Sequence, residues 1–244
     1  GDDTNTTASE LSNYLKTNGY KLTVVGLPKT IDNDVYPISQ TLGADTAAEQ
    51  GSIFFENIVN ENTTSRRQLI IHEIMGRNCG WLTAYTAKYY KEKLRKKFFL
   101  ESIDLMRNQW DIHAIYIPEE KIDVEVESYR LKKVMDKYDC VNIFLSEGAG
   151  IENIVNDLEQ KGKKINRDAY GHIRLDELNP GDWYSKRIAK WTGAEKVLVQ
   201  KSGYFSRSAA PNKVDLSLID KVSKNAVNYA LSSTSGVVGP SDEL

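Results

Sequence analysis

The sequence predicts an α/β protein with mostly parallel sheets, and three observations support this fold class. Apolar runs rich in β-branched residues, such as residues 19–26 and 141–145, alternate with stretches whose apolar residues recur at helical spacing. Each run ends in a loop of glycine and charged residues. With 244 residues and 40% hydrophobic content, the chain can bury a substantial core in one or two domains. Strands joined in this way through helices favour a parallel sheet.

The elements follow in order from these patterns. A glycine-containing loop at residues 1–8 precedes the first predicted helix with no strand before it, so we expect an upstream strand to be missing. Asp45 or Thr46 is the expected N-cap of the second helix. The tail, residues 232–244, is rich in serine and glycine and is expected to fray. The predicted elements are helix 9–18, strand 19–26, helix 43–59, strand 67–75, helix 81–90, strand 111–118, helix 124–138, strand 141–145, helix 152–164, helix 183–192, strand 193–200 and helix 215–231.

The composition excludes several classes of function. A net charge of −2, from 32 basic and 34 acidic residues, gives no electrostatic footprint for nucleic acid. The two cysteines, Cys79 and Cys140, form no Cys-x-x-Cys pattern, which argues against structural zinc or disulfides and favours a reducing, cytoplasmic setting. No apolar stretch approaches the roughly 18 residues that span a bilayer, so no membrane partner is expected.

An acidic stretch after the first strand is the strongest candidate for chemistry. Pro28 ends the strand because it has no N–H for a ladder, so the next residues form a tight loop at the strand's carboxyl end. Open α/β sheets bind ligands at such ends. Lys29 can hold an anion there, while Asp32 and Asp34 can take a proton or order a metal. The alternative from these residues alone is a polar turn.

Four junctions of this kind carry unusual residues: Gly-Asp-Asp at 1–3, Lys-Thr-Ile-Asp-Asn-Asp at 29–34, Met-Gly-Arg at 75–77 and Glu-Gly at 147–148. In order and spacing these motifs resemble those of the phosphofructokinase family, over residues 1 to about 210. The match looks closest to the family's pyrophosphate-dependent branch. The resemblance implies a phosphofructokinase-like fold of two three-layer α/β domains with mostly parallel sheets.

The resemblance also implies a domain division and partners. Residues 1–43 with 173–202 would form the domain that binds pyrophosphate and Mg²⁺, part of it missing upstream. Residues 44–172 with 203–244 would form the fructose 6-phosphate domain. Family members are oligomers, so a homo-oligomer of at least two chains is expected, together with the missing N-terminal segment.

Three residues are similar to the family's donor-binding residues. Asp2 corresponds to the aspartate that helps to hold Mg²⁺, although a helix-capping role would explain it as well. Asp3 stands where ATP-using members have glycine, and its carboxylate would collide with and repel the α-phosphate of ATP. Lys29 resembles the lysine that steadies the transferred phosphoryl group. The pair of Asp3 and Lys29 therefore implies pyrophosphate as the donor.

The rest of the acidic motif resembles the catalytic residues of the family. Asp32 corresponds to the general base that accepts the proton of the sugar's 1-hydroxyl. Thr30 would hydrogen-bond the transferred phosphate, and Asp34 would position substrate or metal. This role for Asp32 displaces the polar-turn alternative.

The sugar-phosphate site is implied by the two later motifs. Met75, Gly76 and Arg77 match its backbone and charge, and Glu147 matches the acid that hydrogen-bonds the sugar hydroxyls. Near Met-Gly-Arg the pattern is shifted by one residue, at Arg67 and Gln68. Arg67 is the candidate for an arginine that reaches a neighbouring subunit's site, and a solvent-facing cation at the strand entry is the alternative.

The segment Tyr170-Gly-His-Ile-Arg174 departs from the family's pattern. His172 corresponds to a histidine that contacts the 6-phosphate, and Tyr170 lies beside it. Arg174 comes one position earlier than the family's arginine, and Arg167 lies close before the histidine. Either Arg174 and Arg167 hold the phosphate through a shifted backbone, or the phosphate is held differently.

These assignments imply a pyrophosphate:fructose 6-phosphate 1-phosphotransferase that makes fructose 1,6-bisphosphate and orthophosphate with Mg²⁺, in a reversible step of glycolysis and gluconeogenesis. One alternative keeps the fold and uses ATP, against which Asp3 argues. A second alternative is a non-catalytic regulatory subunit. The presence of Asp2, Lys29 and Asp32 argues against that alternative.

Overall fold

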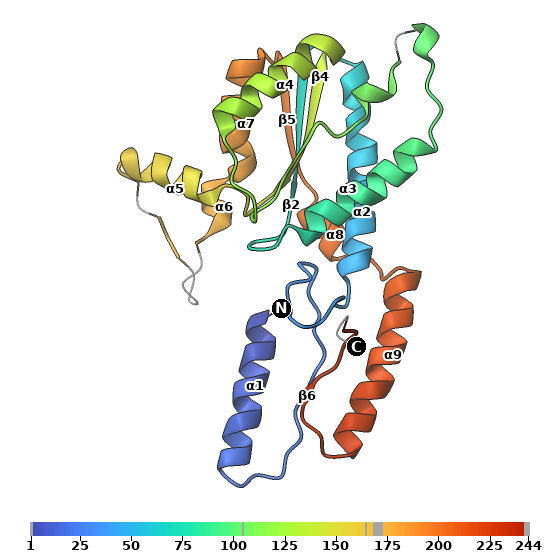
Figure 1. Ribbon diagram of the computed structural model, residues 1–244, viewed down its shortest axis with the longest axis vertical. Coiled ribbons are helices and arrows are strands. Elements are labelled where there is room, and N and C mark those ends of the chain that lie inside the picture. The colour runs from blue at the N-terminus through green and yellow to red at the C-terminus, as the bar shows by residue number, and fades with distance from the viewer. Residues whose placement is uncertain (1, 104, 164, 168–172, 242–244) are drawn as a thin grey trace. The chain divides into compact units, whose positions relative to one another are not determined.

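The computed structural model describes residues 2–103, 105–163, 165–167 and 173–241, with Asp2 and Asp176 as backbone only (Figure 1). By its internal contacts the chain divides into two compact units. The first unit is Gly1–Ala47 with Arg207–Leu244, and the second unit is Ala48–Ser206. No helix among the described residues is both long and apolar enough to cross a membrane.

The first unit joins the two ends of the chain in a parallel pair of short strands. Val25 pairs with Gly236 and Gly26 pairs with Val237, and the buried side chains of Val222, Ala226 and Val238 pack beneath them. The elements of this unit are α1 (Asp2–Thr17), β1 (Val25–Gly26), the start of α2 (Ala44–Ile58), α9 (Lys213–Leu231) and β6 (Gly236–Val237).

Three predictions for the first unit were wrong: the start of α1, the fraying of the tail and the length of β1. Helix α1 begins at Asp2 rather than at residue 9, and the acidic residues Asp2 and Asp3 suit its first turn because the helix dipole favours negative charge there. The tail does not simply fray, because Gly236 N donates to Val24 O at 3.0 Å and Val238 N donates to Gly26 O at 2.9 Å. This pairing takes up the backbone groups of β1, which is much shorter than the predicted strand.

The second unit is built on a four-stranded, all-parallel sheet of strand order β3-β4-β2-β5. Every residue of the central strands β2 and β4 is buried, as expected where helices cover both faces of a parallel sheet. The elements are η1 (Val59–Thr63), β2 (Gln68–Ile74), α3 (Trp81–Arg95), η2 (Glu101–Ile103), η3 (Arg107–Gln109), β3 (Ala114–Tyr116), α4 (Val124–Tyr138), β4 (Cys140–Ser146), α5 (Ile151–Gln160), α6 (Leu175–Leu178), α7 (Pro180–Thr192), β5 (Lys196–Lys201) and α8 (Gly203–Arg207).

Alternate residues of the central strands face two separate helical layers. Leu69 and Ile71 of β2 pack with Leu131 of α4 and Tyr184 of α7 on one face. On the other face, Phe55 of α2 stacks on a β2 histidine and α3 lies alongside, so the unit has three layers (Figure 1). The predicted α/β class with parallel sheets is confirmed.

The division of the chain differs from the predicted domains. The prediction grouped residues 173–202 with residues 1–43, but β5 pairs along its length with β2, from Lys196 opposite Gln68 to Lys201 opposite Glu73. The pairing places residues 173–202 in the second unit. Residues 207–244 belong to the first unit, because β6 pairs with β1 and α9 packs beside it.

His72 is enclosed in an aromatic cluster of the second unit. Its ring is fully buried, stacks on Phe55 with centroids 5.8 Å apart, and meets Phe144 edge-on at 4.9 Å. Burial lowers the pKa of His72 to about 3, from an ordinary value of 6.5. The imidazole is therefore neutral in the folded protein. His72 is thus a packed core residue of the second unit.

We expect His72 to make the stability of the second unit pH-dependent. The unfolded chain takes up a proton below pH 6.5 that the folded chain takes up only near pH 3, so the stability is full above pH 6.5 and falls as the pH drops. The loss is about 1.4 kcal/mol per pH unit. Between pH 7 and pH 5 the free energy of unfolding should therefore fall by about 2 kcal/mol less in the variant His72→Leu than in the wild type. Urea unfolding at both pH values measures this difference, and equal losses in the two proteins would contradict it.

Candidate functional site

The acidic loop of the first unit brings four of the predicted site residues together directly after β1. Thr30 is buried and Asp32 is half-buried, whereas Lys29 and Asp34 are exposed. Asp32 N donates to Thr30 Oγ1 at 3.2 Å, a local turn of the kind that threonine favours. Because this hydroxyl oxygen accepts from Asp32, its own proton can be donated to another acceptor, such as a phosphate oxygen.

The first turn of α1 lies beside the start of this loop. A Cβ placed on Gly26, the last residue of β1, would lie 2.9 Å from Asn5 Oδ1 of α1. Asp3 is exposed in the same turn. The structure therefore brings the turn that carries Asp3 next to the strand that leads into Lys29. Asp2 begins α1, but its side chain lies outside the described part of the chain.

Asp215 of α9 anchors the end of the loop at the start of α2. Its carboxylate is fully buried and accepts hydrogen bonds from Gly43 N at 2.9 Å, from Thr46 N at 2.8 Å and from the Thr46 hydroxyl. The free N–H groups of a helix start need such acceptors. Sequence analysis expected Asp45 or Thr46 to cap this helix. The cap instead comes from Asp215, which is about 170 positions away in the chain, so local sequence could not indicate it.

Two further polar residues of the loop escaped sequence analysis. Asn33 has a left-handed backbone with φ of 57°, and Thr41 is completely buried. Thr41 N donates to Asn33 Oδ1 at 2.7 Å, which joins the two arms of the loop. The available signal was the asparagine between the two aspartates, because asparagine tolerates the left-handed region better than most residues.

The Met-Gly-Arg and Glu-Gly loops of the second unit meet at the carboxyl edge of the sheet. They follow the neighbouring parallel strands β2 and β4, whose ends are aligned. Glu147 N donates to Ile74 O at 2.8 Å, and Ser146 Oγ donates to Gly76 O at 2.7 Å. Gly76 N lies 3.4 Å from Glu147 Oε1, a long hydrogen bond. Glu147 is therefore held beside Gly76, next to Met75 and Arg77.

Gly148 allows this close contact. A Cβ at residue 148 would lie 1.7 Å from Arg77 O, which no side chain could tolerate. Arg77 and Gly148 line a cavity of about 1220 Å³ in the second unit, together with Arg167 and Ile173. The cavity has room for a sugar phosphate, and Arg77 and Arg167 are cations that could meet its charge. Acidic side chains also line it: Glu119, Glu120, Asp123, Glu152 and Asp157.

The two arginines that sequence analysis left as alternatives for the 6-phosphate differ in position. Arg167 lines the cavity and pairs through its backbone with Ile173. Arg174 is exposed, precedes α6, and forms an ion pair with Glu177 at 3.0 Å. This placement favours Arg167. The predicted residues Tyr170 and His172 lie outside the described residues.

Arg187 of α7 is a cavity residue that sequence analysis missed. Its guanidinium lies 3.6 Å from the centroid of the Trp183 ring and pairs with Asp157 at 2.8 Å. Lys161, then Trp183 and Arg187, lower the pKa of Asp157 to about 2. The spacing of Trp183 and Arg187, four residues apart on a helix, was the available signal.

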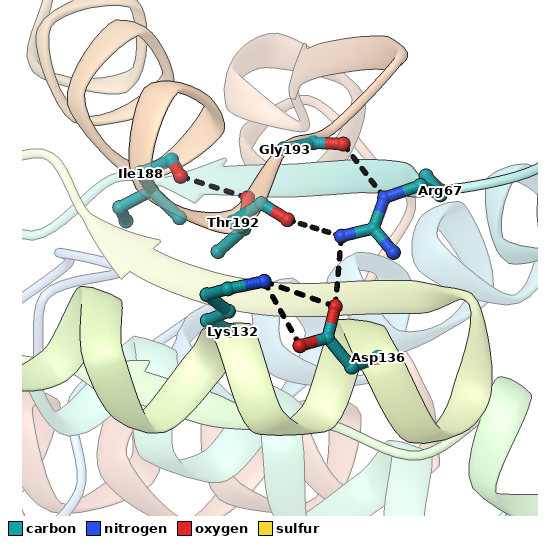
Figure 2. A network of polar contacts seen from close by, with 6 residues as sticks. All are labelled: Arg67, Lys132, Asp136, Ile188, Thr192 and Gly193. Carbon is teal, nitrogen blue, oxygen red and sulfur yellow. Dashed lines mark hydrogen bonds and ion pairs between the residues drawn. The ribbon is translucent and has the colours of Figure 1, made fainter.

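Arg67 makes its described contacts within its own chain, and its reach into a neighbouring subunit stays a prediction. Nε donates to Gly193 O at 2.8 Å, and Nη2 donates to Thr192 O at 2.5 Å and pairs with Asp136 at 3.0 Å (Figure 2). The last carbonyls of a helix attract such a cation. Lys132 and then Arg67 lower the pKa of Asp136. The guanidinium thus caps α7 and joins it to α4.

Gln68 does not face a site in the described structure. Its side chain is fully buried at the start of β2, between Cys140 of β4 and Lys196 of β5. Gln68 is therefore enclosed in the sheet, and its role in substrate binding stays a prediction.

The acidic residues of the loop suit a Mg²⁺ ion that is bound mainly through the phosphate oxygens of a substrate. Within the described ranges, no three histidine, cysteine or acidic residues gather into a group that could hold a metal ion. Mg²⁺ commonly takes only one or two carboxylates and completes its shell with phosphate oxygens and water. Asp32 and Asp34, in one loop, offer carboxylates of this kind.

Comparison with known proteins gives a consistent result. The family model for phosphofructokinase matches residues 1–230. The pyrophosphate–fructose 6-phosphate 1-phosphotransferase of Methylomonas methanica is 54% identical over 243 residues, and that of Mastigamoeba balamuthi is 52% identical over 243 residues. Each match covers 100% of this chain and 59% of the relative, so the chain spans well under two thirds of the relatives' length.

A solved structure shows the same fold at low sequence identity. The pyrophosphate-dependent phosphofructokinase of Marinobacter aquaeolei superposes with a TM-score of 0.67 and 22% identity, over 96% of this chain and 51% of that chain. At this identity the likeness concerns the fold.

Proposed function

The chain belongs to the phosphofructokinase family, and we propose that the natural protein transfers a phosphoryl group from pyrophosphate to the 1-hydroxyl of fructose 6-phosphate. The products are fructose 1,6-bisphosphate and orthophosphate, and the step is reversible. The observation that carries the proposal is that the whole chain matches relatives whose names state this reaction. The grouping of Lys29, Thr30 and Asp32 in one loop supports it chemically.

In the proposed reaction Asp32 is the general base. Its carboxylate accepts the proton of the 1-hydroxyl as that oxygen attacks phosphorus, and the bond from phosphorus to the leaving orthophosphate breaks. Thr30 donates its hydroxyl proton to a phosphoryl oxygen, and Lys29 neutralises the negative charge on the phosphoryl group. Asp34 positions the substrate or the metal.

Mg²⁺, when bound with pyrophosphate, supplies neutralisation of the donor's charge. Asp2 and Asp34 are the residues that would hold it, with one or two carboxylates sufficient. At the other substrate, Arg77 and Arg167 hold the sugar phosphate, and Glu147 accepts hydrogen bonds from the sugar hydroxyls. We further propose that the natural protein is a homo-oligomer.

Assays with both donors test the proposal. The natural protein, fructose 6-phosphate and Mg²⁺ should give fructose 1,6-bisphosphate with pyrophosphate and little with ATP. Robust activity with ATP and none with pyrophosphate would overturn the choice of donor. Activity with neither donor would favour a regulatory subunit.

We expect the variant Asp3→Gly to gain activity with ATP. The substitution removes a carboxylate that would repel and collide with the α-phosphate of ATP, so kcat/KM for ATP should rise by about tenfold or more. The variant Thr4→Gly, at the next exposed position of α1, controls for the effect of glycine on the helix. An ATP activity that is unchanged in Asp3→Gly, or that rises equally in Thr4→Gly, would contradict this role of Asp3.

A further inference from the structure

We propose that Asn33 and Thr41 brace the acidic loop and act as positioning residues for Asp32. This inference rests on the proposed function, because it concerns the placement of the proposed base. It assigns no contact with substrate to either residue. The brace consists of the hydrogen bonds that Asn33 and Thr41 form with each other and with the two arms of the loop, residues 30–33 and 39–41.

Asn33 supplies one half of the brace. Its backbone has φ of 57°, and its side-chain amide bonds to both Ser39 and Thr41. Nδ2 donates to Ser39 O at 3.1 Å, and Oδ1 accepts from Thr41 N at 2.7 Å. One bond needs the amide nitrogen and the other needs the oxygen, so the orientation of the amide is fixed.

Thr41 supplies the other half. Its side chain is completely buried, and its hydroxyl lies 2.8 Å from Thr30 O and 3.0 Å from Asn33 Oδ1. Both partners are acceptors, so the single hydroxyl proton lies between them. A buried oxygen that loses such a donor is left without a hydrogen bond, and this costs free energy. The hydroxyl of Thr41 therefore stabilises the loop.

The brace fixes the backbone on both sides of Asp32. Thr41 holds the carbonyl of Thr30 two residues before it, and Asn33 is the residue directly after it. Asp32 N in turn donates to Thr30 Oγ1 at 3.2 Å. The backbone of the proposed base is therefore confined between two cross-linked neighbours.

The brace is itself anchored to regular structure. Leu42 N donates to Pro28 O at 3.0 Å, which closes the base of the loop. Gly43 N, at the start of α2, donates to the buried carboxylate of Asp215 at 2.9 Å. Thr41 is thus held close to α2 and α9. Its bond to Thr30 O in turn restrains the backbone that leads to Asp32. A base must lie within hydrogen-bond reach of the proton that it removes, so this confinement serves kcat.

Steady-state kinetics of the natural protein with pyrophosphate and fructose 6-phosphate test the inference. Thr41→Val keeps the shape of the side chain and loses the hydroxyl, whereas Thr41→Ser keeps the hydroxyl. We expect Thr41→Val to lower kcat by about 10- to 100-fold, with KM for fructose 6-phosphate changed by less than about twofold. Thr41→Ser should restore kcat to within about threefold of the wild type. Asn33→Gly, which keeps the left-handed backbone and loses the amide, should match Thr41→Val.

A double-variant comparison separates positioning from general loosening of the fold. If the brace acts through Asp32, then Thr41→Val should lower the residual kcat of an Asp32→Asn protein by less than about twofold. A loss in that background as large as in the wild type would overturn the inference, and so would equal kcat values for Thr41→Val and Thr41→Ser. If Thr41→Val does not fold, Asn33→Gly is compared in the same two backgrounds, with the same criteria.

The outcomes also separate this inference from the proposed function. A wild-type protein that uses neither donor overturns the proposed function and, with it, the role of the brace. An active wild-type protein whose Asn33 and Thr41 variants keep full kcat overturns the role of the brace alone.

Discussion

Replacing Asp32 with asparagine is expected to lower kcat with pyrophosphate by about 10³-fold. Asparagine has nearly the same shape but cannot accept the proton of the sugar's 1-hydroxyl. Because the side chain keeps its size and Asp32 N can still donate to Thr30 Oγ1, we expect little change in KM for fructose 6-phosphate. Initial rates of fructose 1,6-bisphosphate formation at saturating substrates measure the effect.

A surface aspartate of the same unit provides the control for Asp32. Asp220 forms an exposed pair with Lys224 on α9, and such pairs contribute little to stability. Asp220→Asn also removes one negative charge from the first unit and should leave kcat unchanged. If Asp32→Asn retained kcat within about threefold of the wild type, Asp32 would not be the base.

The fold of the second unit could be predicted closely from the sequence. Helix α4 was predicted with its observed bounds, and β2 and β4 each differ from prediction by one residue at each end. These strands are buried on both faces, so their apolar residues are nearly continuous, and such a run predicts a buried strand. The assignment to the phosphofructokinase family, predicted from four motifs, is confirmed by the family match.

The first unit was harder to predict because long-range pairs hold it together. The pairing of β1 with β6 joins residues more than 200 positions apart, through a tail whose serine and glycine content suggested fraying. Asp215 caps α2 from a similarly remote position. Neither contact leaves a local periodic signal, so the sequence pattern could not indicate them.

The candidate site shows the same division. The motif residues that follow β1, β2 and β4 could be selected as candidates because strand ends in α/β proteins are the usual places for ligands. The helix-capping contacts of Arg67 were missed because a cation before a strand shows the same sequence pattern whether it caps a helix or reaches a substrate. Asn33 and Thr41 were missed because side-chain bonds across a loop depend on backbone dihedrals that spacing does not reveal.

Gly148 is the position where a single methyl group should do most harm to the sugar-phosphate site. A Cβ at residue 148 would lie 1.7 Å from Arg77 O and 2.7 Å from Arg77 C. These are backbone atoms, which cannot rotate away as a flexible side chain could. The variant Gly148→Ala must therefore displace the Met-Gly-Arg loop or the Glu-Gly loop by more than about 1 Å, and a displacement of that size can lower activity about 100-fold.

We expect this loss to appear as a fall of about 100-fold in kcat/KM for fructose 6-phosphate, because both Arg77 and Glu147 belong to the displaced loops. KM for pyrophosphate should change little, since Lys29 and Asp32 belong to the other unit. Gly236→Ala is the matched control: its added Cβ would have no atom within 4 Å, and its φ is not positive. Equal effects of Gly148→Ala on both substrates would mean that the fold as a whole had been damaged. An effect on fructose 6-phosphate alone would place the sugar phosphate at the edge where β2 and β4 end.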